Sequence, residues 1–324
     1  MPLNRLSRKN TNTEQEEHMD LLMKAIKAVH SSLGTSDVDV AESLNHQRKS
    51  QERFSKLITP AVSVRYERSD IHSGIKNQTI PAEWAIPEFA HRNDKIILYC
   101  HGGGYTCGGL GYAAILAGKL ANHTGLKVLG FEYRLAPENP YPAAIEDATS
   151  VWNYLMYMGY GAKDIFIAGD SAGGNLAMEL ILILKAQKRQ LPLGLILMSP
   201  WTDMTATLPA YEKYKDVDPL LTKEYVLGVR KAYAGGIYEE DIYKTPEFSP
   251  LFADLSGFPP TFIQVGSNEI LRGDSEELYK KLKKQNINCR LETYNGGWHV
   301  FQQMPTQKSS KALDDVKEFI DARI

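Results

Sequence analysis

The 324 residues carry 37 Lys and Arg against 39 Asp and Glu, a formal net charge of −2 at pH 7. Because this charge is nearly balanced and mixed with apolar residues, it excludes a basic surface of the kind that captures nucleic acid or anionic membranes. The three cysteines are too few for a disulfide framework and lack metal-ligand spacing. With no apolar segment long enough for a membrane span and no secretory signal pattern, we expect a cytoplasmic protein.

The first 60 residues precede any strand pattern, and we interpret residues 1–60 as an N-terminal helical cap segment. Apolar residues recur at helical spacing from Glu14 to Leu33, and a weaker helical pattern follows from Val40 to Leu57. The apolar stripe is best explained by packing against the body of the protein rather than by membrane or partner binding. In this setting it could also cover a pocket.

Beyond residue 60 the pattern changes to short apolar strands, with helices interleaved in the later part. The predicted strands are 62–66, 78–84, 95–100, 127–133, 164–168, 193–198, 261–265 and 290–293. Alternating strands and helices predict an α/β protein with a mostly parallel central sheet covered by helices on both faces. We therefore read 61–324 as one domain, with an insertion near 201–255 that contains a helix at Lys223–Tyr233.

A Gly-Asp-Ser-Ala-Gly-Gly sequence spans residues 169–174, after an apolar strand and before a helical run. This strand–turn–helix setting is what a G-x-S-x-G motif requires to present a serine nucleophile. The glycines remove β-carbons that would clash at the sharp turn, and the helix N-terminus favours developing negative charge. A simple helix-capping turn is the alternative, but the setting favours Ser171 as the nucleophile.

A second glycine-rich segment, His101-Gly102-Gly103-Gly104, directly follows the predicted strand 95–100. Acyl transfer needs hydrogen-bond donors aimed at the oxygen that becomes charged in the tetrahedral intermediate. Main-chain N–H groups of Gly103, Gly104 and Ala172 are the natural donors of such an oxyanion hole. A phosphate-binding loop is disfavoured, because no Gly-Lys-[Ser/Thr] sequence follows.

The order of residues along the chain identifies the general base. An α/β-hydrolase carries its acid and then its histidine after the serine, and His299 alone among the eight histidines follows Ser171. Two carboxylates are candidates for the acid that orients it. Glu269 is preferred because it lies just past the predicted strand 261–265, whereas the position of Asp274 favours capping of the next helix.

These motifs together resemble the hormone-sensitive lipase family of bacterial and archaeal carboxylesterases, bacterial family IV of the α/β-hydrolase superfamily. The shared sequences are His-Gly-Gly-Gly at 101–104, Tyr-Arg-Leu-Ala-Pro-Glu at 133–138, Pro-Ala-Ala-Ile-Glu-Asp at 142–147, Gly-Asp-Ser-Ala-Gly-Gly at 169–174 and Trp-His-Val-Phe at 298–301. The resemblance implies an α/β-hydrolase fold of about eight strands with a helical cap. It also implies the same three oxyanion donors, and supporting roles for 133–138 and Asp147. The chain departs from the family in carrying glutamate at 269, where aspartate is commoner.

The resemblance implies a serine carboxylesterase that hydrolyses small, short-acyl esters through an acyl-enzyme intermediate and needs no cofactor. It also allows a homodimer. Two alternatives stay open: a deacetylase acting on acetylated sugars or xenobiotics, and a non-catalytic ligand receptor, as in the plant gibberellin receptors. Substrate choice is expected to depend on 19–33, 201–214 and 223–233, within which the individual binding residues stay unassigned.

Overall fold

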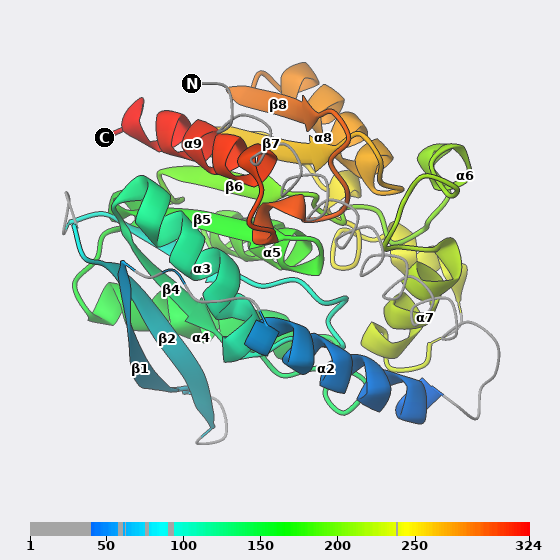
Figure 1. Ribbon diagram of the computed structural model, residues 1–324, viewed down its shortest axis with the longest axis horizontal. Helices are drawn as coiled ribbons and strands as arrows, with labels where there is room; N and C mark the ends of the chain where they lie inside the picture. Colours follow the sequence, from blue (N-terminus) through cyan, green and yellow to red (C-terminus); the bar gives the residue numbers. More distant parts are fainter. Residues whose placement is uncertain (1–39, 58–60, 62, 75–77, 90–93, 238) are drawn as a thin grey trace, which may run out of the picture.

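The computed structural model describes residues 40–57, 61, 63–74, 78–89, 94–237 and 239–324. Its centre is an eight-stranded sheet in the order β1-β2-β4-β3-β5-β6-β7-β8 (Figure 1). The strands are β1 (Val64–His72), β2 (Thr79–Pro87), β3 (Ile96–Cys100), β4 (Lys127–Phe131), β5 (Ile165–Asp170), β6 (Gly194–Met198), β7 (Thr261–Gly266) and β8 (Cys289–Tyr294). All eight predicted strands are confirmed, although β1 continues to His72, well beyond its predicted end.

The six strands β4-β3-β5-β6-β7-β8, given in their order across the sheet, run parallel to one another. Strands β1 and β2 form an antiparallel hairpin, and β2 pairs antiparallel with β4. The central strands β3, β5, β6 and β7 are buried at every residue. Helices cover both faces of a parallel sheet, so both sides of each central strand must be apolar. This burial explains why those strands read as continuous apolar runs.

Helices cover the sheet on both faces. They are α2 (Val40–Leu57), α3 (Leu110–Thr124), α4 (Ala143–Tyr157), α5 (Ala172–Ala186), α6 (Ala210–Lys213), α7 (Lys223–Tyr233), α8 (Arg272–Lys284) and α9 (Gln307–Asp321), with short 3-10 helices at Ala162–Asp164, Glu240–Lys244, Pro250–Phe252 and Phe301–Gln303. On the near face in Figure 1, Leu116 of α3 and Leu313 of α9 share one buried cluster with Phe166 of β5. On the opposite face Trp152 of α4 and Leu180 of α5 share another.

Helix α2 and the insertion between β6 and β7, both predicted to contribute to a cap, lie beside the sheet rather than within it. Helix α2 has the predicted bounds and packs on α3, while the other predicted cap helix, Glu14–Leu33, falls outside the described residues. The insertion between β6 and β7 contains α6 and α7, and α2 runs toward α7 (Figure 1).

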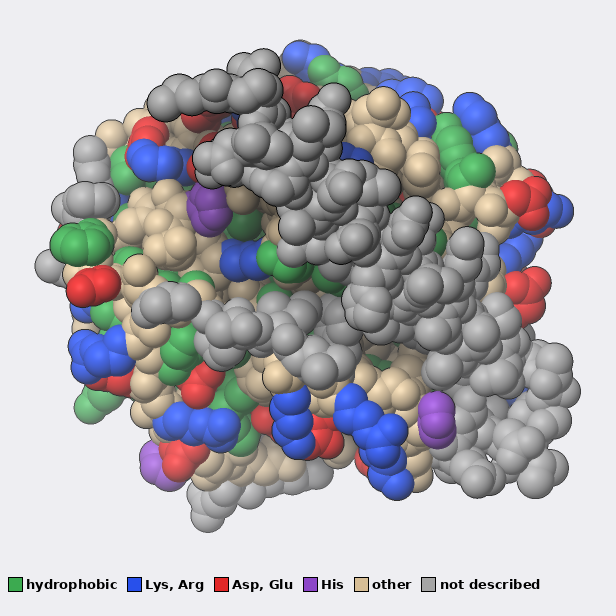
Figure 2. Space-filling model, viewed as in Figure 1, with side chains coloured by type: hydrophobic (Ala, Val, Ile, Leu, Met, Phe, Trp, Pro, Cys, Tyr) green, Lys and Arg blue, Asp and Glu red, His purple; other side chains and the backbone are tan. Residues whose placement is uncertain are grey.

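The surface agrees with the balanced charge of the sequence. On the face shown in Figure 2, Lys and Arg side chains are interspersed with Asp and Glu. Among the described helices, none combines the length and apolar character that crossing a bilayer requires.

Candidate active site

The predicted site residues lie on four loops at one edge of the sheet. The glycine loop 101–104 follows β3, Ser171 follows β5, Glu269 follows β7 and His299 follows β8. These four strands are parallel, so their carboxyl ends meet at the same edge, where ligands bind in open α/β sheets. The fold therefore brings together residues that are nearly 200 positions apart in the chain.

Ser171 occupies the turn between β5 and α5 in a conformation that few non-glycine residues adopt. Its backbone angles are φ 54° and ψ −123°. The turn is held from two sides, because Ser171 N donates to Met198 O at 3.0 Å and Ser171 O accepts from Trp201 N at 3.0 Å. Strain retained in this way is characteristic of the nucleophile turn of α/β-hydrolases, which exposes the serine oxygen above the sheet.

The glycines of the motif allow backbone segments to approach very closely. A β-carbon on Gly173 would lie 2.1 Å from the carbonyl oxygen of Cys100, and one on Gly169 would lie 2.2 Å from that of Gly173. Because backbone atoms cannot yield as a flexible side chain can, only glycine fits at these positions. The first turn of α5 is thereby held against the end of β3, beside the glycine loop.

The structure brings Glu269 and His299 into contact. Nδ1 of His299 lies 2.9 Å from Oε2 of Glu269, and Glu269 has no exposed surface. The other carboxylate oxygen, Oε1, accepts hydrogen bonds from Ser199 Oγ at 2.8 Å and Gly266 N at 2.6 Å. Ser199 Oγ also accepts from Val300 N at 3.1 Å, which ties the histidine loop to the same group.

Two opposing effects set the pKa of the His299 imidazole. Burial lowers the pKa, but the hydrogen bond and the negative charge of Glu269 outweigh it, aided by Asp218 and Asp170. The net result is a pKa raised above the ordinary 6.5. Because Nδ1 faces Glu269, Nε2 is the nitrogen through which His299 would accept a proton.

Asp274, the competing acid, has a different environment. Its Oδ1 accepts hydrogen bonds from Thr202 N and Asp203 N, both at 2.9 Å. It lies in the first turn of α8, whose N-cap is Leu271, so the expected capping role is not observed. Instead, Asp274 fixes the start of the insertion. Burial, followed by the charge of Asp203, raises its pKa well above the usual value.

The glycine loop presents main-chain donors at the same edge of the sheet. Gly103 and Gly104 have φ values of 115° and 62°, which favour glycine. The carbonyl of Gly103 accepts from Thr106 N at 3.1 Å and from Cys107 N at 2.9 Å, which closes the loop into a turn. Within the described part of the chain, no group accepts a hydrogen bond from the N–H of Gly103, Gly104 or Ala172.

Two buried side chains hold the start of the glycine loop. Oδ1 of Asp170, the residue before the serine, accepts from Gly102 N at 2.9 Å and from Tyr99 Oη at 2.5 Å. The His101 ring stacks on Tyr133 at 4.2 Å between centroids, and Tyr133 Oη donates to His101 O. Burial lowers the pKa of His101 to about 4, so this imidazole is neutral at pH 7 and acts as a packed support.

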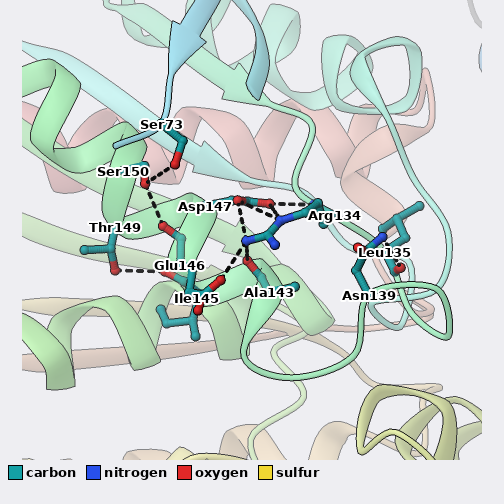
Figure 3. Close-up of polar contacts among 10 residues, drawn as sticks. All are labelled: Ser73, Arg134, Leu135, Asn139, Ala143, Ile145, Glu146, Asp147, Thr149 and Ser150. Atoms are coloured by element: carbon teal, nitrogen blue, oxygen red, sulfur yellow. Dashed lines mark hydrogen bonds and ion pairs between the residues drawn. The ribbon is translucent and has the colours of Figure 1, made fainter. Parts of the chain in front are cut away.

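The two motifs that follow β4 are joined by an ion pair (Figure 3). Arg134 N donates to Oδ2 of Asp147 at 2.8 Å, and the Arg134 guanidinium contacts the same carboxylate at 3.0 Å. The guanidinium also reaches Ala143 O at 3.1 Å and Glu146 Oε2 at 2.8 Å. This network fixes the connection between β4 and α4, in agreement with the supporting role expected for 133–138 and Asp147.

Three residues that contact the site, Asp170, Ser199 and Asp218, were not predicted from the sequence. Asp170 holds the glycine loop through Gly102, and Ser199 holds Glu269. Asp218 Oδ2 accepts a hydrogen bond at 2.8 Å from Ile270 N, next to Glu269 in the chain. Ser199 directly follows the buried strand β6, so its place at the same sheet edge was available as a signal. No local pattern marks Asp218, which lies 52 residues from Ile270.

In the portion of the chain that the structure covers, no group of three or more His, Cys, Asp or Glu side chains is arranged to hold a metal ion. The three cysteines are free, with Cys100 and Cys107 buried. The groups that the loops bring to this edge include a serine, a histidine, a carboxylate and main-chain donors.

Known proteins are similar to this chain in sequence and in fold. Residues 97–303 match a family described by its alpha/beta hydrolase fold. An esterase of Acinetobacter venetianus is 36% identical over 263 residues, which cover 80% of this chain and 82% of the esterase. An acetyl-hydrolase of Streptomyces hygroscopicus is 32% identical over 68% of this chain and 72% of its own length.

A solved structure extends the likeness to three dimensions. The crystal structure of an esterase from the bacterial hormone-sensitive lipase family has a TM-score of 0.82 and 30% sequence identity, covering 94% of this chain and 98% of that one. The matched family, the curated relatives and the solved structure agree with the resemblance carried by the motifs. The chain belongs to the α/β-hydrolase family, within its hormone-sensitive lipase group of carboxylic-ester hydrolases.

Proposed function

We propose that this chain is a serine carboxylesterase that hydrolyses small, short-acyl esters through an acyl-enzyme intermediate. The observation that carries the proposal is the buried contact between His299 and Glu269, at the sheet edge where the strained turn presents Ser171. A nucleophile, a base and an orienting acid in the order Ser, Glu, His are the parts that such chemistry requires.

In the first step Ser171 Oγ attacks the ester carbonyl carbon while Nε2 of His299 accepts the serine proton. The oxygen of the tetrahedral intermediate becomes negative, and the N–H groups of Gly103, Gly104 and Ala172 are the proposed donors to it. The intermediate collapses when His299 returns the proton to the departing alcohol, which leaves the acyl group on Ser171. Glu269 keeps the imidazole oriented and stabilises its charged form.

In the second step water attacks the acyl-enzyme by the same route. His299 takes a proton from the water, the oxyanion forms again, and the carboxylic acid departs as Ser171 regains its proton. The overall reaction converts one ester and one water into one acid and one alcohol.

The preference for a short acyl chain rests on the relatives and not on a pocket. One relative is called an acetyl-hydrolase, and an acetyl group is among the shortest acyl chains of a carboxylic ester. The same name favours the second candidate, deacetylation of an acetylated sugar or xenobiotic, because serine chemistry serves esters and amides alike. The cap function of residues 1–60, the catalytic domain at 61–324, the homodimer and the cytoplasmic location stay predictions.

Hydrolysis of p-nitrophenyl esters from acetyl to decanoyl, compared between wild type and Ser171→Ala, tests the proposal. Wild-type turnover should be highest for short acyl chains, and kcat of the variant should be about a million-fold lower than that of wild type. A peak at long chains would change the proposal to a lipase. Equal background rates in both proteins would exclude serine esterase chemistry and favour the ligand-receptor alternative.

A further inference from the structure

Helix α2 is bound to the glycine loop through the side chain of Arg48. Arg48 Nε donates to the carbonyl oxygen of Thr106 at 2.7 Å, two positions beyond Gly104. Arg48 Nη2 donates to the carbonyl oxygen of Ala136 at 2.8 Å. One guanidinium of the N-terminal segment therefore joins the loop after β3 to the segment after β4.

Glu138 fixes the plane of this guanidinium. Nη1 and Nη2 of Arg48 donate to Oε1 and Oε2 of Glu138, both at 2.7 Å. Such a two-pronged pair constrains both the position and the rotation of the arginine head group. The Arg48 hydrogen bond is the main reason that the pKa of Glu138 is lowered to about 2. The direction of the Arg48 Nε–H toward Thr106 is thus set by a second, charged contact.

The carbonyl that Arg48 contacts belongs to the same turn as the candidate oxyanion donors. Thr106 N and Cys107 N both donate to Gly103 O, so Thr106 and Gly103 cannot shift independently. Tyr105 O accepts from Ala136 N at 2.9 Å, which joins the loop to the segment that Arg48 also contacts. A displacement of Thr106 would therefore be passed to the N–H groups of Gly103 and Gly104.

The residue beside Arg48 holds the loop from a second direction. Cys107 Sγ donates to Gln47 Oε1 at 3.3 Å, so α2 also contacts the loop at Cys107. A β-carbon on Gly104 would lie 3.2 Å from the Tyr225 hydroxyl of α7, so α7 packs directly against the loop. The loop is therefore contacted by both α2 and the insertion.

We propose that Arg48 is a positioning residue for the oxyanion hole, holding Gly103 and Gly104 at the geometry that acyl transfer requires. The inference rests on the proposed esterase function and extends it to the N-terminal segment. Exposed ion pairs usually contribute little to stability, and Glu138 is 58% exposed. We therefore assign the importance of Arg48 to its two main-chain contacts, which act on catalytic geometry.

The first test compares Arg48→Met with Lys56→Met in the full-length protein. Lys56 lies on the same helix but pairs with Glu52, and both side chains are largely exposed. Misplacing a catalytic group by about 1 Å can cost on the order of a hundred-fold in rate. We expect Arg48→Met to lower kcat roughly ten- to a hundred-fold with KM changed less than about twofold, because the donors act mainly on the transition state. Lys56→Met should match wild type.

A trifluoromethyl ketone with an acetyl-sized acyl side distinguishes positioning from a structural role. Ser171 Oγ adds to its carbonyl carbon and the serine proton passes to His299, so the adduct carries the negative oxygen that the donors would stabilise. The inhibition constant should rise in Arg48→Met by the same factor by which kcat/KM falls. A variant that loses thermal stability while kcat and the inhibition constant stay at wild-type values would overturn the inference.

Amide hydrogen exchange of the segment 101–109 gives a readout independent of ester turnover. The segment should exchange faster in Arg48→Met than in wild type or Lys56→Met, since its anchor is removed. Equal exchange rates of this segment in all three proteins would overturn the positioning role, even if the esterase activity of Arg48→Met were reduced. If wild type shows no Ser171-dependent turnover, the esterase proposal fails, while the exchange result still decides whether Arg48 holds the loop.

Discussion

Nδ1 of His299 lies 2.9 Å from Oε2 of Glu269, although the two residues are 30 positions apart and follow different strands. Ser199 Oγ and Gly266 N donate hydrogen bonds to the other carboxylate oxygen, so the Glu269 side chain is held in one orientation. A carboxylate held in this manner selects the tautomer of the histidine with its proton on Nδ1, which leaves Nε2 as the nitrogen that accepts a proton in the proposed reaction.

Replacement of Glu269 by Gln should therefore impair catalysis far more than stability. The amide keeps the size of the side chain but removes the charge that favours the imidazolium, and a comparable change in serine hydrolases costs about ten-thousand-fold in kcat. Steady-state hydrolysis of p-nitrophenyl acetate, with thermal unfolding as the check on folding, measures both effects.

Asp274→Asn is the matched control, because Asp274 hydrogen-bonds to Thr202 N and Asp203 N. It should alter stability and leave kcat within about tenfold of wild type, since losses at buried hydrogen bonds are on the order of 1–3 kcal/mol of folding free energy. A larger loss of kcat in Asp274→Asn than in Glu269→Gln would transfer the orienting role to Asp274.

The pH dependence of kcat/KM should report the same contact. His299 must be neutral to accept the serine proton, so activity falls as the pH drops through the pKa of His299. That pKa is raised above 6.5, because Glu269 outweighs the opposing effect of burial. The midpoint of the acid limb should therefore lie above 6.5 in wild type.

Glu269→Gln supplies the sign test. Without the carboxylate, burial is the largest remaining influence and lowers the pKa of His299, so the midpoint should move to lower pH. The profile is measured with a substrate for which chemistry is rate-limiting. Identical midpoints in the two proteins would mean that His299 is not the titrating base or that Glu269 is not its partner.

Much of this site could be predicted from sequence because its residues sit beside strong local signals. The apolar strand before Ser171, the glycines around it and the position of His299 after the last strand all lie in short windows of sequence. Motif and strand pattern agree there, as expected where local preference matches the fold.

The remaining contacts depend on tertiary packing. Arg48 reaches Glu138 across 90 positions, and Ser199 reaches Glu269 across 70, with no periodicity that links either pair. The role of Asp274 could not be predicted from the sequence either. Its position at the start of a helix resembles a cap, whereas its carboxylate turns to the backbone at Thr202 and Asp203.

The buried imidazole of His101 should make the protein sensitive to acid. Its pKa is lowered to about 4, compared with about 6.5 in an unfolded chain. Between these values the unfolded state binds more protons than the folded state, so stability decreases as the pH falls. The penalty attributable to His101 is about 2 kcal/mol at pH 5, when the two pKa values are applied in the linkage relation.

Urea unfolding of wild type and His101→Gln at pH 7.5 and pH 5 isolates this effect. Other groups titrate in both proteins, so the difference between the two pH dependences belongs to residue 101. Wild type should lose about 2 kcal/mol more than the variant on acidification, as a buried neutral histidine requires. Equal losses would place the pKa of His101 close to that of an exposed histidine.

Two glycines of the chain should respond in opposite ways to replacement by alanine, because one lies against neighbouring backbone and the other lies in an open part of a helix. A β-carbon on Gly173 would meet the carbonyl oxygens of Cys100 and His101 at 2.1 Å and 2.5 Å, so Gly173→Ala must displace β3 or α5 and should unfold or inactivate the protein. Gly228 lies within α7, and apart from its chain neighbours and the backbone of its own helix no heavy atom lies within 4 Å of the added carbon. Gly228→Ala should therefore stabilise the protein by about 0.5–1 kcal/mol, because alanine is the better helix former. Thermal unfolding of the two variants measures the expected loss of stability in the first and the expected gain in the second. A well-folded, active Gly173→Ala would mean that the turn at Ser171 can accommodate a β-carbon that the structure leaves no room for.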